Sequence, residues 1–332
     1  MSALDRTRAL LAAALAIGAV VAASVPAMAE QGYPDQPISL VVPFAAGGPT
    51  DTIARIIAPP MAKALGQPIK IENISGGGGT TGITEASLAK PDGYTIMIGH
   101  MGTHGAAPAL FRTLKYDPAR TFDPIGLAAG TPVVIVARKD FPASDLKSFV
   151  EALQKKGSTY SQAHAGVGSV SHSTGMLFDS IVNVKPTFVV YRGTGPAMND
   201  LISGQVDFLT DQIVNVVPHL QAGTIRAYAI ATPERSPALP GVPTTREAGL
   251  PSFEVSAWNA VFAPKNLPKD VHARLVDALD KALDDPTVRE RLLKLGGRIP
   301  AGSERGPVAL QKLVESEVAR WTPALSAAVE EQ

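Results

Sequence analysis

Three glycine-rich segments of this sequence could bind an anion without help from any charged side chain. They are residues 43–51, 75–82 and 163–172, and each lies between a predicted strand and a predicted helix. Glycine lets the backbone turn tightly, and the helix behind presents unpaired N–H groups with a partial positive charge. None of the segments contains Lys or Arg, although Arg55 lies one turn into the first helix. A ligand that met two such helix starts would best carry a carboxylate at each end, although any one loop could equally just close a tight connection.

Histidines and one acid add further candidates for the same pocket. Four of the six histidines fall at the ends of predicted strands: His100, His104, His164 and His172. Each could line the pocket or be a hydrogen-bonded structural residue, and no helical H-E-x-x-H or H-x-x-E-H spacing predicts a metal site. Asp211, with Gln212 beside it, follows a strand at 206–209 and could face the same cleft. An acid there would suit a ligand that also carries a hydroxyl or an amine, and a structural hydrogen bond is the equal alternative.

Two enzymatic interpretations compete with a binding role: a dinucleotide-binding enzyme and a serine hydrolase. Residues 77–82 match the dinucleotide pattern G-x-G-x-x-G, but they follow the second strand, and the next strand ends at 99–101 without a ribose-binding acid. We therefore expect no nucleotide cofactor. The sequence has no G-x-S-x-G nucleophile elbow. Ser169 with His172 and an acid could form a hydrolase triad, but serine at a helix start is more often a cap.

The composition and the first residues predict an exported protein. Lys+Arg and Asp+Glu both number 30 in 332 residues, so no net charge favours nucleic acid or an anionic membrane. The chain has no cysteine. Arg6 and Arg8 precede an apolar stretch at 10–25 and small residues at 26–29, which predicts a signal peptide over 1–29, with an uncleaved anchor as the alternative. We expect a periplasmic location, where NAD and ATP chemistry would be out of place.

Strands alternate with helices, which predicts parallel βαβ units. The predicted strands are 38–42, 69–74, 94–98, 133–137, 187–191, 206–209, 225–231 and 255–263. The predicted helices include 52–65, kinked or split by Pro59-Pro60, and 145–156, capped by Ser144. Two α/β units with helices left over at the end predict a chain that leaves its first domain and returns. Domain 1 would hold 30–130 and 240–332, domain 2 would hold 131–239, and crossings near 127–133 and 230–243 would form a two-strand hinge beside a cleft.

Several motifs in order resemble those of one receptor family. They are residues 42–51, 73–79, 92–94, 166–172, 191–197, 204–207 and 242–249. By these motifs the chain resembles the substrate-binding proteins of tripartite tricarboxylate transporters, the TctC or Bug-type receptors, along essentially its whole mature length. The resemblance implies a bilobed type II periplasmic-binding-protein fold that closes on a carboxylate and delivers it to membrane permease subunits.

The resemblance also implies which residues contact the ligand. Carried over position by position, the contacts are Phe44, Ala46, Gly47, Thr50, Gly168, Ser169 and His172, with Thr80 as a further candidate. The sequence departs from the common pattern at His164, where a small Ser is usual, and at His104, which lies in a variable loop; these two positions would bear on the far end of the ligand. We predict a monomeric, non-catalytic receptor for a dicarboxylate of four to six carbons, such as malate, succinate or adipate. The alternatives are a receptor for an aromatic carboxylate and an exported serine hydrolase.

Overall fold

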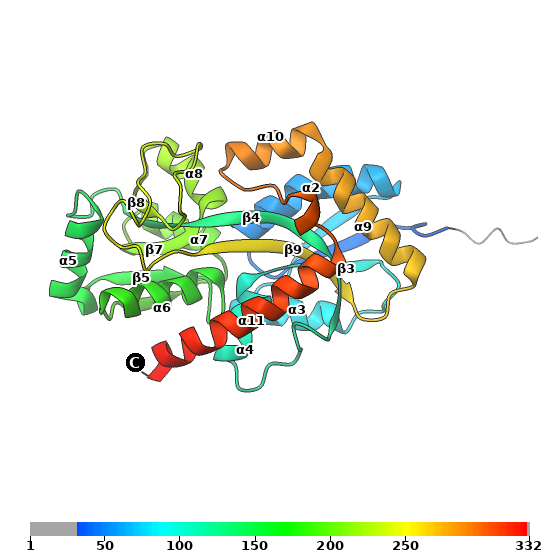
Figure 1. Cartoon of the computed structure of the whole chain (residues 1–332), viewed down its shortest axis with the longest axis horizontal. Helices are drawn as coiled ribbons and strands as arrows, with labels where there is room; N and C mark the ends of the chain where they lie inside the picture. The colour runs from blue at the N-terminus through cyan, green and yellow to red at the C-terminus, as the bar shows by residue number, and fades with distance from the viewer. Residues whose placement is uncertain (1–31, 331–332) are drawn as a thin grey trace, which may run out of the picture. The chain divides into compact units, whose positions relative to one another are not determined.

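The computed structural model describes residues 32–330, so the predicted signal peptide at 1–29 lies outside the described residues. Its strands form two sheets that share the long strand β4 (Phe122–Arg138). The first sheet runs in the order β2 (Ile69–Asn73), β1 (Ile38–Val42), β3 (Thr95–His100), β9 (Ser256–Pro264) and β4. The second has β8 (Ile225–Ile230) on one edge of β4 and β7 (Phe208–Gln212), β5 (Ser161–His164) and β6 (Thr187–Val190) on the other. We call these sheets, with their helices, the first and second lobes (Figure 1).

Each lobe contains parallel βαβ units, as the strand–helix alternation predicts. In the first lobe β1 pairs in parallel with β2 and β3, and in the second β5 pairs in parallel with β6 and β7. The connecting helices are α2 (Pro49–Leu65), α3 (Thr80–Ser87), α6 (Val170–Val182) and α7 (Thr194–Ile202). Because a helix follows the carboxyl end of each of these strands, the helix N-termini gather at the strand ends, where open α/β sheets bind ligands.

Strands β4 and β9 connect the lobes. β4 pairs antiparallel with β9 through residues 122–132 and then with β7 and β8 through 133–138. The chain returns to the first lobe at β9. The residue just before β9, Val255, still donates its N–H to the Ala231 carbonyl of the second lobe. The preceding segment stays with β8, since the Ile230 N–H donates to Pro243 O and the Thr245 N–H to Ile230 O. The domain boundaries at 130 and 239 stay a prediction.

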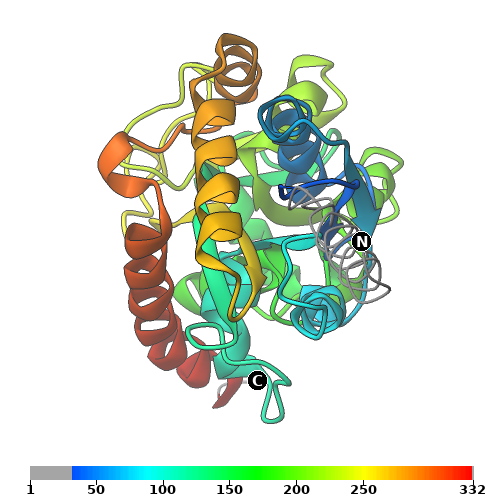
Figure 2. The ribbon, with the colours of Figure 1, turned by 90° about the vertical axis from the view of Figure 1, so that its right-hand side faces the viewer.

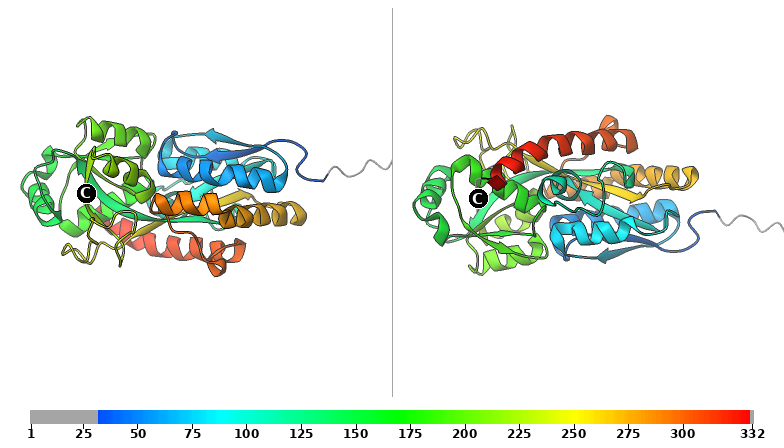
Figure 3. Two further views of the ribbon diagram at one scale, coloured as in Figure 1. Left: turned by 90° about the horizontal axis from the view of Figure 1, so that it is seen from above. Right: turned by 90° about the horizontal axis from the view of Figure 1, so that it is seen from below.

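The remaining helices cover the two sheets, and the last of them contacts both lobes. They are α4 (Ala107–Leu110), α5 (Leu146–Lys156), α8 (Ile213–Gln221), α9 (Lys269–Asp284), α10 (Pro286–Lys294) and α11 (Pro307–Glu330), with a π-helix η2 (Gly102–Ala106) and 3-10 turns at Gly77–Gly79, Gly157–Thr159 and Gly302–Glu304. Figure 2 views the first lobe end on, with α9 in front of β4. α11 contacts η2, α4 and β4 and also α6 of the second lobe, so it lies along both lobes (Figure 3). No helix within 32–330 combines the length and apolarity that a bilayer span requires.

Helix α2 is one unbroken helix, contrary to the expected kink or split at Pro59-Pro60. Pro59 is exposed and Pro60 is half-buried, so neither ring displaces a core side chain. The opposite face buries Ile53, Ile57 and Met61 completely. Burying three large apolar side chains stabilises the helix by roughly 1.5–3 kcal/mol each, which offsets the missing hydrogen bonds.

Two other local predictions differ from the structure: the residue that caps α5, and the absence of the helices α8 and α10 from the predicted elements. The carboxylate of Asp145, and not Ser144, accepts the first-turn N–H of Ser148 and so caps α5. Helices α8 and α10 were not predicted at all. Pro218 lies inside α8, and α10 is only nine residues long, so the periodic signal of each was weak.

Candidate functional site

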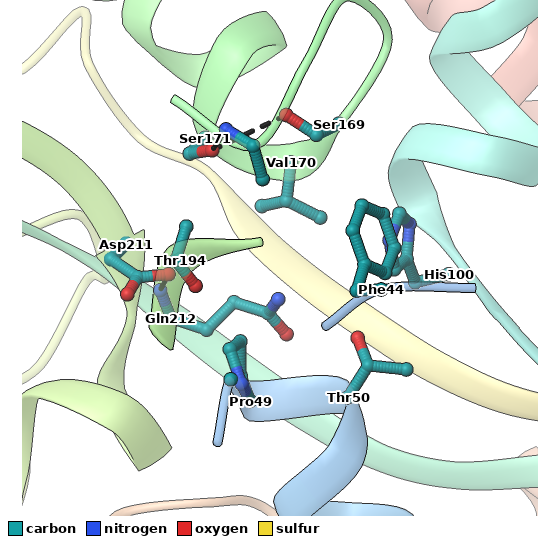
Figure 4. A pocket seen from close by; sticks show the side chains of 12 residues that line it. Phe44, Pro49, Thr50, His100, Ser169, Val170, Ser171, Thr194, Asp211 and Gln212 are labelled. Atoms are coloured by element: carbon teal, nitrogen blue, oxygen red, sulfur yellow. Dashed lines mark hydrogen bonds between the residues drawn. The ribbon is translucent and has the colours of Figure 1, made fainter. Parts of the chain in front are cut away.

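A cavity of about 290 Å³ lies where the strand ends of the two lobes meet (Figure 4). The first lobe lines it with Phe44, Gly48, Pro49, Thr50 and His100. The second lobe lines it with Ala165, Ser169, Val170, Ser171, Thr194, Asp211 and Gln212. Part of this volume is open to solvent, so the space that the two lobes enclose is smaller.

Three helix N-termini converge on this cavity. α2 begins behind Gly48, α6 behind Ser169 and α7 behind Gly193, and the first residues of all three helices are among the lining residues. The first N–H groups of a helix have no partner within it, and the helix dipole adds a partial positive charge there. The cavity can therefore hold negative charge through the backbone alone.

No Lys or Arg is among the residues that line the cavity. The nearby cation Arg55 instead pairs with Asp51, at 2.8 Å between Nε and Oδ2. Burial of Asp51 acts to raise its pKa, but hydrogen bonds from Arg55, the Gly47 N–H and Asn73 together hold that pKa below its ordinary value. Asn73 also donates to the Phe44 carbonyl at 3.0 Å. Asp51 is thus ionised, and it fixes the shape of the 44–47 loop.

The predicted site residues divide into two groups. Those that line the cavity are Phe44, Thr50, Ser169 and Asp211. Those that lie outside it are Ala46, Gly47, Thr80, His104, His164, Gly168 and His172. The Gly47 N–H is used by Asp51, at 3.0 Å, and the Thr80 hydroxyl donates to the Gly77 carbonyl in an exposed position.

His100 is the histidine that reaches the cavity. It is the last residue of β3, and its ring stacks on Phe44 with the centroids 5.0 Å apart. Its Nδ1 accepts the backbone N–H groups of Gly102 and Thr103, so the ring proton lies on Nε2. Complete burial lowers the pKa of His100 to about 4. His100 is therefore a neutral hydrogen-bond donor and contributes no charge.

His104 belongs to the core of the first lobe. It lies in η2, is fully buried, and stacks on Phe262 with the centroids 4.1 Å apart. Its Nδ1 lies 2.9 Å from the Thr103 hydroxyl. The sequence places His104 in a loop beyond the strand at 94–98, but η2 turns the side chain inward onto β3 and β9.

His164 and His172 accept hydrogen bonds from the loop that lies between them in the sequence. His164 Nδ1 accepts the Gly166 N–H at 3.1 Å, and His172 Nδ1 accepts the Gly168 N–H at 3.5 Å. The two ring centroids are 4.6 Å apart. Instead of lining the cavity, the pair holds the loop that precedes α6 in place.

The residues of the hydrolase alternative are close together, but they are not connected as a triad. The Ser169 hydroxyl accepts the backbone N–H of His172 and lies 3.2 Å from the Ser171 hydroxyl. The His172 imidazole instead accepts a hydrogen bond from the Gly168 N–H. Ser169 therefore acts as the N-cap of α6. Across 32–330, no three His, Asp or Glu side chains are grouped so as to hold a metal ion.

A buried hydrogen-bond network at the base of the cavity links the lobes. Asn259 on β9 is completely buried and accepts from the Thr50 hydroxyl at 3.2 Å. Its amide donates to Gln212 Oε1 at 2.8 Å and to the Thr131 hydroxyl at 3.3 Å. Thr131 on β4 also donates to Gln212 Oε1, at 2.7 Å. The network orients Thr50 and Gln212, one lining residue from each lobe.

The lobes touch on both sides of the cavity through glycines. The Ala45 N–H donates to the Arg192 carbonyl at 3.0 Å. A Cβ added at Gly195 would lie 2.9–3.0 Å from backbone atoms of the 46–48 segment, and one added at Gly78 would overlap the Val167 carbonyl. Residues 75–82 therefore make a contact between the lobes and do not contact the cavity.

Sequence reasoning missed the N-terminus of α7 as an anion site. Thr194 is buried and lines the cavity, and its hydroxyl has no hydrogen-bond partner within the described residues. The signal was present in Arg192-Gly-Thr-Gly-Pro196, a glycine-rich connection between a strand and a helix. Its G-T-G pattern matches the G-V-G pattern of the segment at 163–172, so the same reasoning could have found it.

We expect acid to destabilise this fold through its buried histidines. Burial lowers the pKa to about 4 for His100 and to about 3 for His104 and His172, and a neighbouring histidine adds to the effect for the last two. Below pH 6.5 the unfolded chain binds protons that the folded chain does not, so stability falls by up to about 1.4 kcal/mol per pH unit for each histidine.

Two buried acids oppose this loss: burial raises the pKa of Asp211 to about 6 and raises that of Asp179 well above its ordinary value. Because three histidines outweigh these two acids, we expect urea denaturation to give a free energy of unfolding about 2–4 kcal/mol lower at pH 5 than at pH 7.5. Equal midpoints at the two pH values would show that these histidines are protonated in the fold.

Comparisons with known proteins agree on one family and one fold. A family model described as the tripartite tricarboxylate transporter family receptor, TctC, matches residues 53–328. The structure of MatC from Rhodopseudomonas palustris with bound malate is 49% identical, with a TM-score of 0.86 over 88% of this chain and 99% of that one.

Two further solved structures are similar over nearly their full lengths. The periplasmic binding protein BugD is 41% identical, with a TM-score of 0.86 over 89% of this chain and 98% of that chain. Rpa4515 of R. palustris with adipate is 32% identical, with a TM-score of 0.84 over 89% and 98% of the two chains. The expected bilobed periplasmic-binding-protein fold is thereby confirmed.

Proposed function

This chain belongs to the tripartite tricarboxylate transporter receptor family of periplasmic solute-binding proteins, and on that premise we propose that it captures a small dicarboxylate of four to six carbons. The proposal rests chiefly on three helix N-termini that meet at one cavity without any Lys or Arg. Such a site favours negative charge spread over several oxygens, because each N–H group donates one hydrogen bond.

The solved relatives support a short aliphatic diacid. MatC was solved with malate and Rpa4515 with adipate, which have four and six carbons, and each protein shares about a third to a half of its residues with this chain.

The hydrogen bonds on offer are sufficient for a receptor. Micromolar affinity corresponds to about −8 kcal/mol. A hydrogen bond to a charged group contributes roughly 1.5–3 kcal/mol, so a few at each carboxylate exceed the costs of desolvation and closure. The Ser169 hydroxyl and the free N–H groups in the first turns of α2, α6 and α7 supply these donors.

Transport follows from the two-lobed form. We propose that the domains 30–130 with 240–332 and 131–239 close on the ligand about β4 and β9, and that permease subunits of a tripartite tricarboxylate transporter recognise the closed monomer. We further propose that the chain acts in the periplasm after removal of residues 1–29. Release of intact ligand to a permease requires no catalytic group, so we propose that the protein is not an enzyme.

A thermal-shift screen of mono-, di- and tricarboxylates, aromatic acids, amino acids and esters tests the proposal. At a ligand concentration of 100 times Kd, binding stabilises the fold by about 2.7 kcal/mol, which raises Tm by roughly 5 °C for a chain of this size. We expect this shift from malate, succinate or adipate, with the ligand recovered unchanged.

The same screen separates the alternatives. A shift from benzoate-like acids alone would indicate an aromatic carboxylate receptor. Hydrolysis of an ester, lost in Ser169→Ala, would indicate the serine hydrolase. If no acid raises Tm, the receptor proposal is wrong.

A further inference from the structure

One acidic side chain lies inside the cavity that is built for anions. Asp211, at the end of β7, lines the cavity and is 1% exposed. Its Oδ1 accepts the Gln212 N–H at 2.8 Å, and its Oδ2 accepts the Asn215 amide at 2.6 Å. Two carboxylate oxygens offer about four acceptor positions, so acceptor capacity remains for a ligand.

Within residues 32–330, no Lys or Arg forms an ion pair with Asp211. Its partners Gln212 on β7 and Asn215 on α8 are neutral, and Thr194 of α7 lies close enough to affect its pKa without completing a hydrogen bond. The nearby histidines, His100 on β3, His164 on β5, His172 on α6 and His219 on α8, have pKa values that burial lowers. Burial raises the pKa of Asp179 on α6 well above its ordinary value, and Arg138 on β4 pairs with Asp207 and Asp140. Burial raises the pKa of Asp211 itself to about 6, and the Asn215 and Gln212 hydrogen bonds limit the rise.

Two donors without partners lie beside this acceptor. Gln212 Oε1 is occupied by Thr131 and Asn259, which leaves its amide nitrogen with no partner among the described side chains. The buried Thr194 hydroxyl is likewise unpartnered there. Figure 4 shows Asp211, Thr194 and Gln212 together on one wall of the cavity. On this wall Gln212 and Thr194 offer donors for a carboxylate of the ligand. The adjacent Asp211 offers an acceptor for a donor group of the ligand.

We propose that Asp211 selects carboxylic acids that carry a hydrogen-bond donor, a hydroxyl or an ammonium group, on the carbon next to a carboxylate. The inference rests on the proposed function and narrows its ligand class. Asp211 and Gln212 are consecutive, so the donor of the ligand has to lie within one or two bonds of the carboxylate that Gln212 and Thr194 hold. A hydroxyl or ammonium group then fills the free acceptor position of Asp211, and a CH₂ group leaves that position empty.

Protonation makes the selection depend on pH. An acid without the donor brings its carboxylate beside a carboxylate, and like charges in one buried site disfavour double ionisation. Succinate therefore binds with Asp211 protonated, takes up a proton, and loses up to about tenfold in affinity per pH unit above 6. Malate and aspartate give ionised Asp211 a donor and lose less. The preference for malate over succinate accordingly increases with pH.

Isothermal titration at pH 5.5 and pH 8 tests this inference with L-malate, L-aspartate and succinate. Two buffers of different ionisation enthalpy report proton uptake. For the wild-type chain we expect the ratio of malate to succinate affinity to increase at least tenfold from pH 5.5 to pH 8, with proton uptake for succinate. The titrations with L-aspartate show whether Asp211 recognises a hydroxyl group, an ammonium group or either.

The matched variants are Asp211→Asn and Asp179→Asn. Asp179 is also a buried acid with a raised pKa, but it lies in α6 beside Gln162 and does not line the cavity. Asp211→Asn should make the ratio independent of pH and strengthen succinate binding at pH 8, whereas Asp179→Asn should behave as wild type. The ratio of malate to succinate affinity and the proton uptake with succinate are measured on the wild-type chain. They therefore test the role of Asp211 even if Asp211→Asn misfolds.

Two results would count against different claims. Equal affinity for malate, aspartate and succinate at both pH values, without proton uptake, would overturn the role of Asp211 and leave the carboxylate receptor intact. Absence of binding by every carboxylate would instead remove the proposed function on which the inference rests.

Discussion

Replacing Gly195 with alanine is expected to weaken ligand binding by about 10- to 100-fold and to leave the ligand-free fold intact. The added Cβ would lie 2.9 Å from the Gly47 carbonyl carbon, 3.0 Å from Ala46 O and 3.0 Å from Gly48 N. All three are backbone atoms of the facing lobe, so no side chain can move aside. Overpacking of this kind costs about 1–3 kcal/mol, and the cost applies only when the lobes touch.

Gly241→Ala is the matched control, because a Cβ there meets nothing within 4 Å and the residue lies in an exposed loop after β8. Titration calorimetry should show weak binding only for Gly195→Ala, and small-angle scattering should show that its compact ligand-bound form is lost. The Tm without ligand should stay the same or increase, since alanine favours α7 over glycine. Wild-type affinity in Gly195→Ala would show that ligand binding does not require this contact.

Replacing Asn259 with leucine is expected to reduce the free energy of unfolding by about 2–4 kcal/mol. Leucine has a similar shape, so the loss comes from hydrogen bonding. The substitution leaves the Thr50 hydroxyl without its acceptor and the Gln212 carbonyl without one of its donors, in a site with no exposure. Each buried polar group left unpaired costs roughly 1–3 kcal/mol.

Urea denaturation measures this cost, with Asn199→Leu on the exposed surface of α7 as the control. The control should change stability by no more than about 0.5 kcal/mol. Ligand affinity should also fall in Asn259→Leu, because Thr50 and Gln212 lose the group that orients both. If Asn259→Leu is as stable as wild type, water or a rearranged Gln212 must satisfy the network.

Local sequence patterns determined the parts of the site that depend on neighbouring residues. The strand at 38–42 is predicted to the residue, and the loops predicted before α2 and α6 lead into helices whose first residues line the cavity. These features follow from glycine, capping residues and apolar alternation, all of which act over a few residues. The motifs, taken in order, also indicated the family.

Only the tertiary structure decided which of the candidate residues come together. His104 turns into the core because η2 follows β3, and the loop at 75–82 meets Val167 of the other lobe. The third helix start at the cavity is that of α7, and Asn259 joins Thr50 to Gln212 across 209 and 47 residues of sequence. Contacts between segments so far apart depend on how two lobes pack about β4 and β9, and no local periodicity records that packing.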